Sequence, residues 1–252
     1  MAIIRTILVV LVFLVALFGF LPLVLVAFVL SFLGLKKSMA MFTYRLAQGA
    51  ARAMIFFTGC SLNIQGRENI PRKDGVCFVS NHVGLFDIVL ALAFIGRPFG
   101  FVAKRELLYA PFVNIWIWLL GGLFMDRKNL KRAHHAIEEG VKRIKTGGGM
   151  IIFPEGTRSR SRGLQPFRSG SFKLATKAEA VIIPMTINGT YDVFERTNLI
   201  QKTPLDVIFG KPISTTDIPY EERKQVLSDK VHGIIEETLK TTYMSDLNRL
   251  NR

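Results

Sequence analysis

The residues that decide the fold class are an apolar run and the polar stretch behind it, Val76-Cys77-Phe78-Val79-Ser80-Asn81-His82-Val83-Gly84-Leu85-Phe86-Asp87. The apolar run predicts a buried strand, and parallel α/β sheets place their chemistry at strand ends. His82 and Asp87 are five apart and do not share a helix face, but a turn at Gly84 brings them together. A carboxylate on one imidazole nitrogen leaves the other nitrogen to act as a general base. Taken alone, the spacing equally fits a core histidine beside an unrelated aspartate.

Three other segments accompany this one in a defined order. They are Lys104-Arg105-Glu106-Leu107, with Pro111 and Asp126-Arg127 behind it; Phe153-Pro154-Glu155-Gly156-Thr157-Arg158-Ser159; and Ile183-Pro184-Met185. Together the four segments resemble the ordered motifs of the glycerolipid acyltransferases, specifically the 1-acylglycerol-3-phosphate (lysophosphatidic acid) acyltransferases. The resemblance extends from about Gly66 to Pro212 and is strongest in the segment 153–159.

The resemblance implies an enzyme that acylates the sn-2 hydroxyl of 1-acylglycerol 3-phosphate, giving phosphatidic acid. The acyl donor is a thioester of coenzyme A or of acyl-carrier protein, and no cofactor or metal is implied. His82 then serves as the general base and Asp87 stabilises the imidazolium. Arg158 and Lys104 are implied to bind the acceptor phosphate, with Glu155, Gly156 and Thr157 in the same loop. Asn81 and Pro184 are implied to support the site, and Glu155 to orient Arg158 or the glycerol hydroxyl.

The charge balance also indicates an anionic partner. The chain has 33 basic and 19 acidic residues, a net charge of +14. Nucleic acid, an acidic lipid surface or a phosphorylated substrate would each explain this charge. Nucleic acid does not explain the long apolar segment at the N-terminus, so we expect an anionic membrane lipid as a partner and no nucleic acid.

The two cysteines, Cys60 and Cys77, have no metal-type or redox spacing, which predicts that they are ordinary core residues.

The N-terminal apolar segment, residues 6–35, contains no charge and predicts a retained membrane anchor. As one straight helix it would be about 45 Å long, against about 30 Å of hydrocarbon core. The helix therefore tilts, projects or breaks near Gly19–Pro22, and either a span or a re-entrant segment is compatible with the sequence. Basic residues flank it, with Arg5 before it and Lys36, Lys37, Arg45 and Arg52 after it. They predict a cell-membrane location with the rest of the chain on the cytoplasmic side.

The remaining pattern alternates strands with helices. Apolar runs predict strands at 62–65, 76–79, 99–103, 150–153, 181–187 and 205–209, and helical patterns cover 38–58, 88–95, 130–145 and 221–243. The helix 38–58 fits either a membrane surface, with its arginines toward headgroups, or the globular part. The apolar stretch 109–124 fits a buried helix or an acyl-chain pocket, with Trp118 in the core and Trp116 toward the surface or the pocket.

These patterns predict an α/β fold with a mixed β-sheet and flanking helices, preceded by an N-terminal membrane-binding helical pair. We expect an anchor at 1–59 and a catalytic domain at 60–252.

The adjacent residues His134 and His135 are predicted to be helix-surface residues because they lack further ligands at metal-site spacing.

The stretch 156–178 carries six basic residues and no acidic one. Its position behind a strand favours an anion site over a solvated loop. These residues are Arg158, Arg160, Arg162, Arg168, Lys173 and Lys177.

Two other functions fit the sequence. One is a related acyltransferase acting on glycerol 3-phosphate or a lyso-aminolipid, and the other is a non-catalytic basic module at the membrane surface.

Overall fold

The computed structural model describes residues 1–126, 129–161 and 163–250. Arg127 and Arg162 lie outside the described residues, as do the side chains of Lys36 and Lys37. Within the described ranges the chain forms a seven-stranded sheet in the order β1-β7-β6-β2-β5-β3-β4, with β6 and β7 as the antiparallel pair. The strands are β1 Ser61–Gln65, β2 Val76–Ser80, β3 Phe99–Lys104, β4 Leu123–Met125, β5 Gly149–Ile152, β6 Val181–Asn188 and β7 Pro204–Phe209. The predicted mixed sheet is confirmed.

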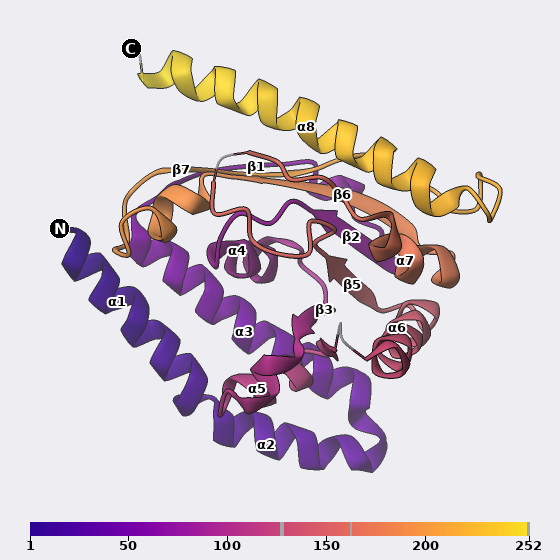
Figure 1. Ribbon diagram of the computed structural model, residues 1–252. Helices are drawn as coiled ribbons and strands as arrows, with labels where there is room; N and C mark the ends of the chain where they lie inside the picture. Colours follow the sequence, from indigo (N-terminus) through magenta and orange to yellow (C-terminus); the bar gives the residue numbers. More distant parts are fainter. Residues whose placement is uncertain (127–128, 162, 251–252) are drawn as a thin grey trace.

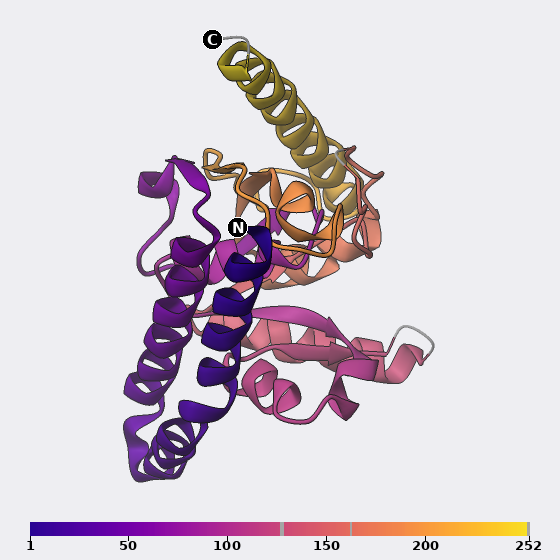
Figure 2. The same ribbon diagram turned by 90° about the vertical axis from the view of Figure 1, so that its left-hand side faces the viewer.

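Helices cover both faces of the sheet (Figure 1). On one face lie α3 (Lys36–Thr58) and α4 (Phe86–Phe94), and on the other α6 (Leu130–Lys145), α7 (Lys173–Ala178) and α8 (Arg223–Leu250). Figure 2 shows α8 and the N-terminal helices on opposite sides of the molecule. Side chains alternate across a strand, so Phe78 joins the core with α3 and α4, while Cys77 and Val79 join the core with α6 to α8. Residues 76–79 of the central strand β2 are apolar because both faces of the strand are buried, and the buried Ser80 ends it.

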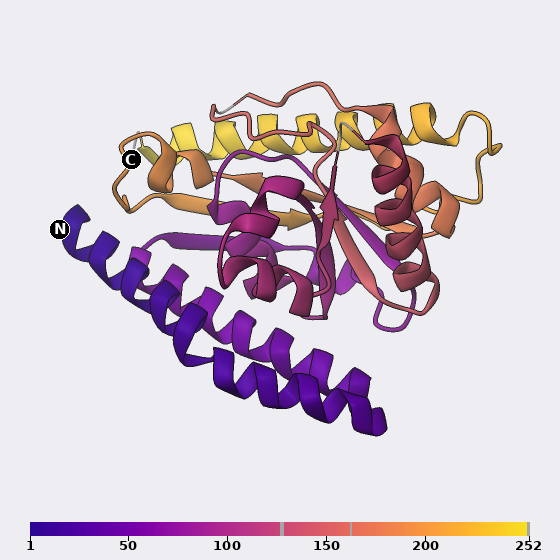
Figure 3. The ribbon, with the colours of Figure 1, turned by 60° about the horizontal axis from the view of Figure 1, so that its bottom comes forward.

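The N-terminal segment forms a helical hairpin. Its first arm is α1 (Ala2–Leu14), a π-helical turn and α2 (Leu21–Leu30), and α3 returns beside it in the opposite direction (Figure 3). The helix does break at Phe20, within the predicted 19–22 stretch, but the chain reverses later, at Leu33 and Gly34. Gly34 has φ +87°, a conformation that glycine adopts without steric cost.

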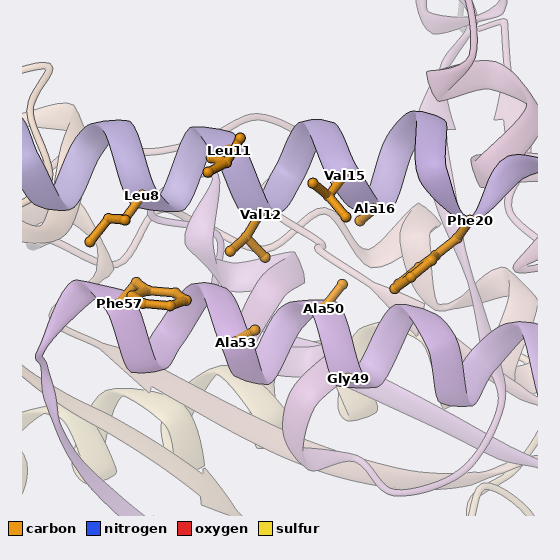
Figure 4. Close-up of a pocket in the computed structure, with 10 residues that line it drawn as sticks. All are labelled: Leu8, Leu11, Val12, Val15, Ala16, Phe20, Gly49, Ala50, Ala53 and Phe57. Carbon is orange, nitrogen blue, oxygen red and sulfur yellow. The ribbon is translucent and has the colours of Figure 1, made fainter.

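The first arm is apolar and largely exposed. Ala2–Leu30 has a mean hydropathy of 3.1 over its most apolar window, of which only 17% is buried. It is the one described helical segment long and apolar enough to cross a membrane. Between α1 and α3 lies a cavity of about 360 Å³ (Figure 4). It is lined by Leu8, Leu11, Val12, Val15, Ala16, Phe20, Gly49, Ala50, Ala53 and Phe57. This lining offers hydrocarbon contacts and no polar side chain.

The return arm α3 packs on the globular part through the carboxyl end of α4. Tyr44 Oη donates to the Leu92 carbonyl at 3.2 Å, and both Gln48 Nε2 and Arg52 Nε donate to the Ala93 carbonyl. These bonds satisfy carbonyls that a helix end otherwise leaves unpaired. Arg52 is exposed but its Nε binds the globular part, so of the two alternatives for this helix the structure favours packing on the globular part. The division at residues 59 and 60 stays a prediction, and α3 shares the core of the catalytic part.

The aromatic stretch at 109–124 packs against the hairpin on one side and against the sheet on the other, where Ile117 and Leu120 are buried. It forms α5 (Val113–Leu119) and β4. Trp116 Nε1 donates to the Leu17 carbonyl at 3.1 Å, and the Trp118 ring contacts the Phe28 ring at 5.1 Å. Trp118 is 55% exposed, so its predicted core position is wrong. The physical reason is that α5 lies between β3 and the apolar first arm, and Trp118 lies on the side of α5 that faces the arm.

The helix α6 has the predicted bounds. The Asn129 side chain caps it by accepting a hydrogen bond from the Arg132 backbone N–H at 3.1 Å. His134 and His135 are exposed on its surface, as predicted. Cys77 is buried, whereas Cys60, directly before β1, is only half-buried.

Candidate active site

The loop between β2 and α4 brings His82 and Asp87 together. The chain bends at Gly84, and His82 Nδ1 lies 2.7 Å from Asp87 Oδ2. Asp87 is fully buried, and its Oδ2 also accepts hydrogen bonds from the backbone N–H groups of Val83 and Gly84. The imidazole is 20% exposed and stacks on the Phe153 ring. Because Nδ1 is held by the carboxylate, Nε2 is the nitrogen available to take a proton.

Gly84 is needed for space and not for backbone freedom. It does not adopt a positive φ. A Cβ built on Gly84 would lie 2.5 Å from Glu195 Oε2 and 2.9 Å from Oε1. The bend that unites His82 with Asp87 therefore packs directly against the Glu195 carboxylate.

Glu155, in the loop after β5, is a buried partner of the His82 loop. Its Oε1 accepts a hydrogen bond from the His82 backbone N–H at 2.6 Å, and the Ser159 N–H donates to the His82 carbonyl at 2.8 Å. Burial raises the pKa of Glu155 to about 7, opposed by hydrogen bonds from the His82 and Gln165 backbones, while the Asp87 charge adds to the rise. Arg158 Nη1 faces Glu195 Oε1 at 3.5 Å and not Glu155, so of the two roles expected for Glu155 the orientation of the glycerol hydroxyl stays a prediction.

The supporting residues bind neighbouring strands. Asn81 Nδ2 donates to the Ile187 carbonyl at 2.8 Å, and Asn81 Oδ1 accepts from the Ile187 N–H at 2.9 Å. These two bonds join the end of β2 to β6. Pro184 lies within β6 opposite Val79, and its carbonyl accepts from the Gly210 N–H. Pro184 therefore lies in the sheet, and Asn81 directly follows β2 and precedes the histidine.

Sequence reasoning missed two residues that follow β6. Thr190 is fully buried, and its Oγ1 donates to Asp87 Oδ1 at 2.6 Å. Glu195 Oε1 accepts from the Leu85 N–H at 2.6 Å in addition to its contact with Arg158. The available signal was the polar stretch Asn188-Gly189-Thr190 directly after an apolar strand. Its relevance became clear only when β6 was found beside β2.

A cavity of about 750 Å³ opens at these strand ends. Its polar wall includes His82, Lys104, Gly156, Thr157, Arg158, Arg160 and Arg168, and its apolar wall includes Leu123, Met125, Ile137 and Leu174. Three arginines of the basic stretch thus border the cavity, while Lys177 instead pairs with Glu138 of α6. A base, two kinds of cation and an apolar surface together suit a phosphorylated acceptor with a hydrocarbon tail.

The sequence profile of a family described as Acyltransferase matches residues 61–188, which include both loops of this site. The chain belongs to this family. It is 30% identical over 200 residues to the 1-acyl-sn-glycerol-3-phosphate acyltransferase of Borreliella burgdorferi, covering 79% of this chain and 80% of that relative. The enzyme of that name from Escherichia coli is 41% identical over 114 residues, covering 45% of this chain and 46% of its own length.

The fold of this acyltransferase is also similar to that of a solved relative. The crystal structure of the 1-acyl-sn-glycerophosphate (LPA) acyltransferase PlsC from Thermotoga maritima superimposes with a TM-score of 0.78 at 26% identity. The match covers 96% of this chain and 98% of that one. The similarity therefore includes the N-terminal helices as well as the sheet.

Proposed function

We propose that this acyltransferase transfers a fatty acyl group from a thioester to the sn-2 hydroxyl of 1-acylglycerol 3-phosphate, giving phosphatidic acid. The observation that carries the proposal is the His82–Asp87 pair at a cavity that also has Arg158 and Lys104 on its wall. The names of the relatives support the same acceptor.

In this reaction His82 acts as the general base. Nε2 takes the acceptor hydroxyl proton as the hydroxyl oxygen attacks the thioester carbonyl, and Asp87 balances the charge of the imidazolium. When the tetrahedral intermediate collapses, the carbon–sulfur bond breaks and the imidazolium returns the proton to the leaving thiolate. A positioned base of this kind contributes about 10² to 10⁴ in rate. Direct transfer needs no covalent intermediate on the protein.

The cations and the apolar wall select the acceptor. The guanidinium of Arg158 has paired donors that match two phosphate oxygens, and Lys104 adds a point charge. The apolar residues from β4, α6 and α7, among them Leu123, Ile137 and Leu174, provide a surface for an acyl chain. Either acyl-coenzyme A or acyl-carrier protein supplies the thioester in this proposal.

The hairpin holds the enzyme on the membrane. Thr6 Oγ1 accepts a hydrogen bond from the Ile200 N–H, and Leu17 accepts one from Trp116, so the first arm contacts the globular part at two points along its length. Two such contacts favour insertion into one leaflet over a full crossing. Arg5 and Arg45, which flank the apolar arm, favour the cytoplasmic face and its anionic lipids.

An acceptor assay on the full-length protein in detergent tests the reaction. Lysophosphatidic acid, glycerol 3-phosphate and a lyso-aminolipid are offered with acyl-coenzyme A and, separately, with acyl-carrier protein. We expect phosphatidic acid to be the main product. Faster acylation of either other acceptor would overturn the proposed acceptor.

A reporter tests the membrane orientation. Fused after Arg252, it should be reached only from the cytoplasm, and labelling from outside intact cells would contradict this orientation.

A further inference from the structure

Glu195 lies between the two halves of the site. It ends the π-helical turn Tyr191–Glu195 after β6, and its side chain is 9% exposed. Its Oε1 accepts a 2.6 Å hydrogen bond from the Leu85 N–H, in the loop that carries His82 and Asp87. The same oxygen lies 3.5 Å from Arg158 Nη1. One carboxylate oxygen therefore contacts both the loop of the general base and the arginine of the second loop.

The loop is built closely around this carboxylate. A Cβ at Gly84 would lie 2.5 Å from Glu195 Oε2, so a larger residue there would displace this carboxylate. That second oxygen is buried and has no hydrogen-bond partner among the described residues. A buried carboxylate is costly unless a charge or a hydrogen bond compensates it. Within the described ranges, Arg158 is the cation that pairs with Glu195.

We propose that Glu195 is a positioning residue for acyl transfer, which sets where Arg158 holds the acceptor phosphate relative to His82. This inference rests on the proposed function. The hydroxyl and the phosphate of the acceptor are joined by a short glycerol backbone, so the base and the cation must stand at a matched separation. Glu195 fixes that separation because it contacts both loops. The guanidinium has five N–H donors, so the contact through Nη1 leaves others for the phosphate.

Glu195→Gln distinguishes the contact of this side chain with the Leu85 N–H from its contact with Arg158. Glutamine has the same length and retains an oxygen for the Leu85 N–H, but it removes the charge that attracts Arg158. We expect the KM for lysophosphatidic acid to rise about tenfold, with a smaller change in kcat, because a charge-assisted contact is lost. A role confined to loop stability would lower kcat and the melting temperature instead. An unchanged or lower KM would show that Glu195 competes with the phosphate, and would overturn the proposal.

A double-mutant cycle tests whether Glu195 acts through Arg158. Wild type, Glu195→Gln, Arg158→Lys and the double variant are compared as full-length proteins. If the proposal is correct, Glu195→Gln causes little further loss once Arg158 is replaced. Additive losses would overturn it. Equilibrium binding of lysophosphatidic acid, measured with the same four proteins carrying His82→Ala, gives the same comparison where turnover is too slow.

A matched control comes from the same π-helical turn. Asp192 pairs with Arg196 at 3.4 Å, so Asp192→Asn also removes an acid from an ion pair in that turn. We expect its KM for lysophosphatidic acid to stay at the wild-type value, and a tenfold rise there would assign the effect to the turn and overturn the role of Glu195. Failure of the wild type to acylate lysophosphatidic acid would overturn the proposed function. An active wild type with additive losses overturns only the role of Glu195.

Discussion

The strand-end site and the N-terminal hairpin depart in opposite directions from the usual separation of apolar and polar residues. At the site, Asp87 and Thr190 are polar and fully buried. In the hairpin, Ile3, Val26 and Val29 are apolar and more than half exposed. A buried polar group or a large exposed apolar surface is the informative exception in a folded protein.

The buried polar groups of the site and the exposed apolar residues of the hairpin are compensated in different ways. The site is compensated internally: the Asp87 carboxylate receives hydrogen bonds from Val83, Gly84 and Thr190 and contacts the imidazole of His82. Among the described residues the outer face of the hairpin has no comparable internal cover, and in the proposed function the hydrocarbon of a membrane supplies it. Substitutions should therefore affect chemistry in one region and location in the other.

The largest expected effect is on chemistry. His82→Ala should lower kcat by about 10² to 10⁴ or more because the general base is removed. Asp87→Asn should be severely impaired as well, since an amide does not stabilise the imidazolium. The measurement is kcat, with melting temperature and lysophosphatidic acid binding as controls for the fold. Substantial turnover by His82→Ala would contradict the assignment of the base.

The next effect is on location. Val26→Glu combined with Val29→Glu should release the protein from membranes, because each charge placed in hydrocarbon costs about 3 kcal/mol, and less near the interface. Both side chains are exposed, so folding should be retained. Sedimentation with vesicles after a high-salt wash measures the change. Leu62→Glu, at a residue of β1 that is 42% exposed, is the matched control and should remain bound. Unchanged sedimentation of the double variant would contradict the assignment of the hairpin to membrane location.

A pH effect on stability is expected from Glu155 in the site. The pKa of Glu155 is raised from 4.5 to about 7, so the folded protein keeps this proton to a higher pH than the unfolded chain. The resulting stabilisation is complete below about pH 4.5 and is lost as the pH rises through 7. It amounts to at most about 3 kcal/mol. Denaturant titrations at pH 5 and pH 8 should show a larger loss for the wild type than for Glu155→Gln. Equal losses in both proteins would contradict this sign.

The smallest expected effect comes from Thr190. Thr190→Val keeps the shape but removes the hydroxyl that donates to Asp87, and kcat should fall about tenfold because a hydrogen bond to a buried charge is lost. Thr190→Ser retains the hydroxyl and should stay near the wild-type rate. Equal losses in the two variants would show that the methyl group, and not the hydrogen bond, matters.

Local patterns in the sequence determined several elements of this protein. The apolar runs of β2 and β5 predicted buried strands, and the sequence around Asn129 predicted the start of α6. These features depend on neighbours within a few residues, because strand alternation, helix periodicity and capping are local properties. The pairing of His82 with Asp87 was also accessible, since only five positions separate them.

Contacts between distant residues were decided by the tertiary structure alone. Thr190 lies 103 positions from Asp87, and Glu195 lies 37 positions from Arg158. Arg158 pairs with Glu195 and not with nearby Glu155, because the Glu155 side chain is bonded to the His82 backbone. Trp118 is exposed because it lies on the side of α5 that faces the hairpin and not β3. No local pattern encodes these pairings, since they depend on the order of strands in the sheet and on which helices meet, and side-chain chemistry alone leaves many partners equally suitable.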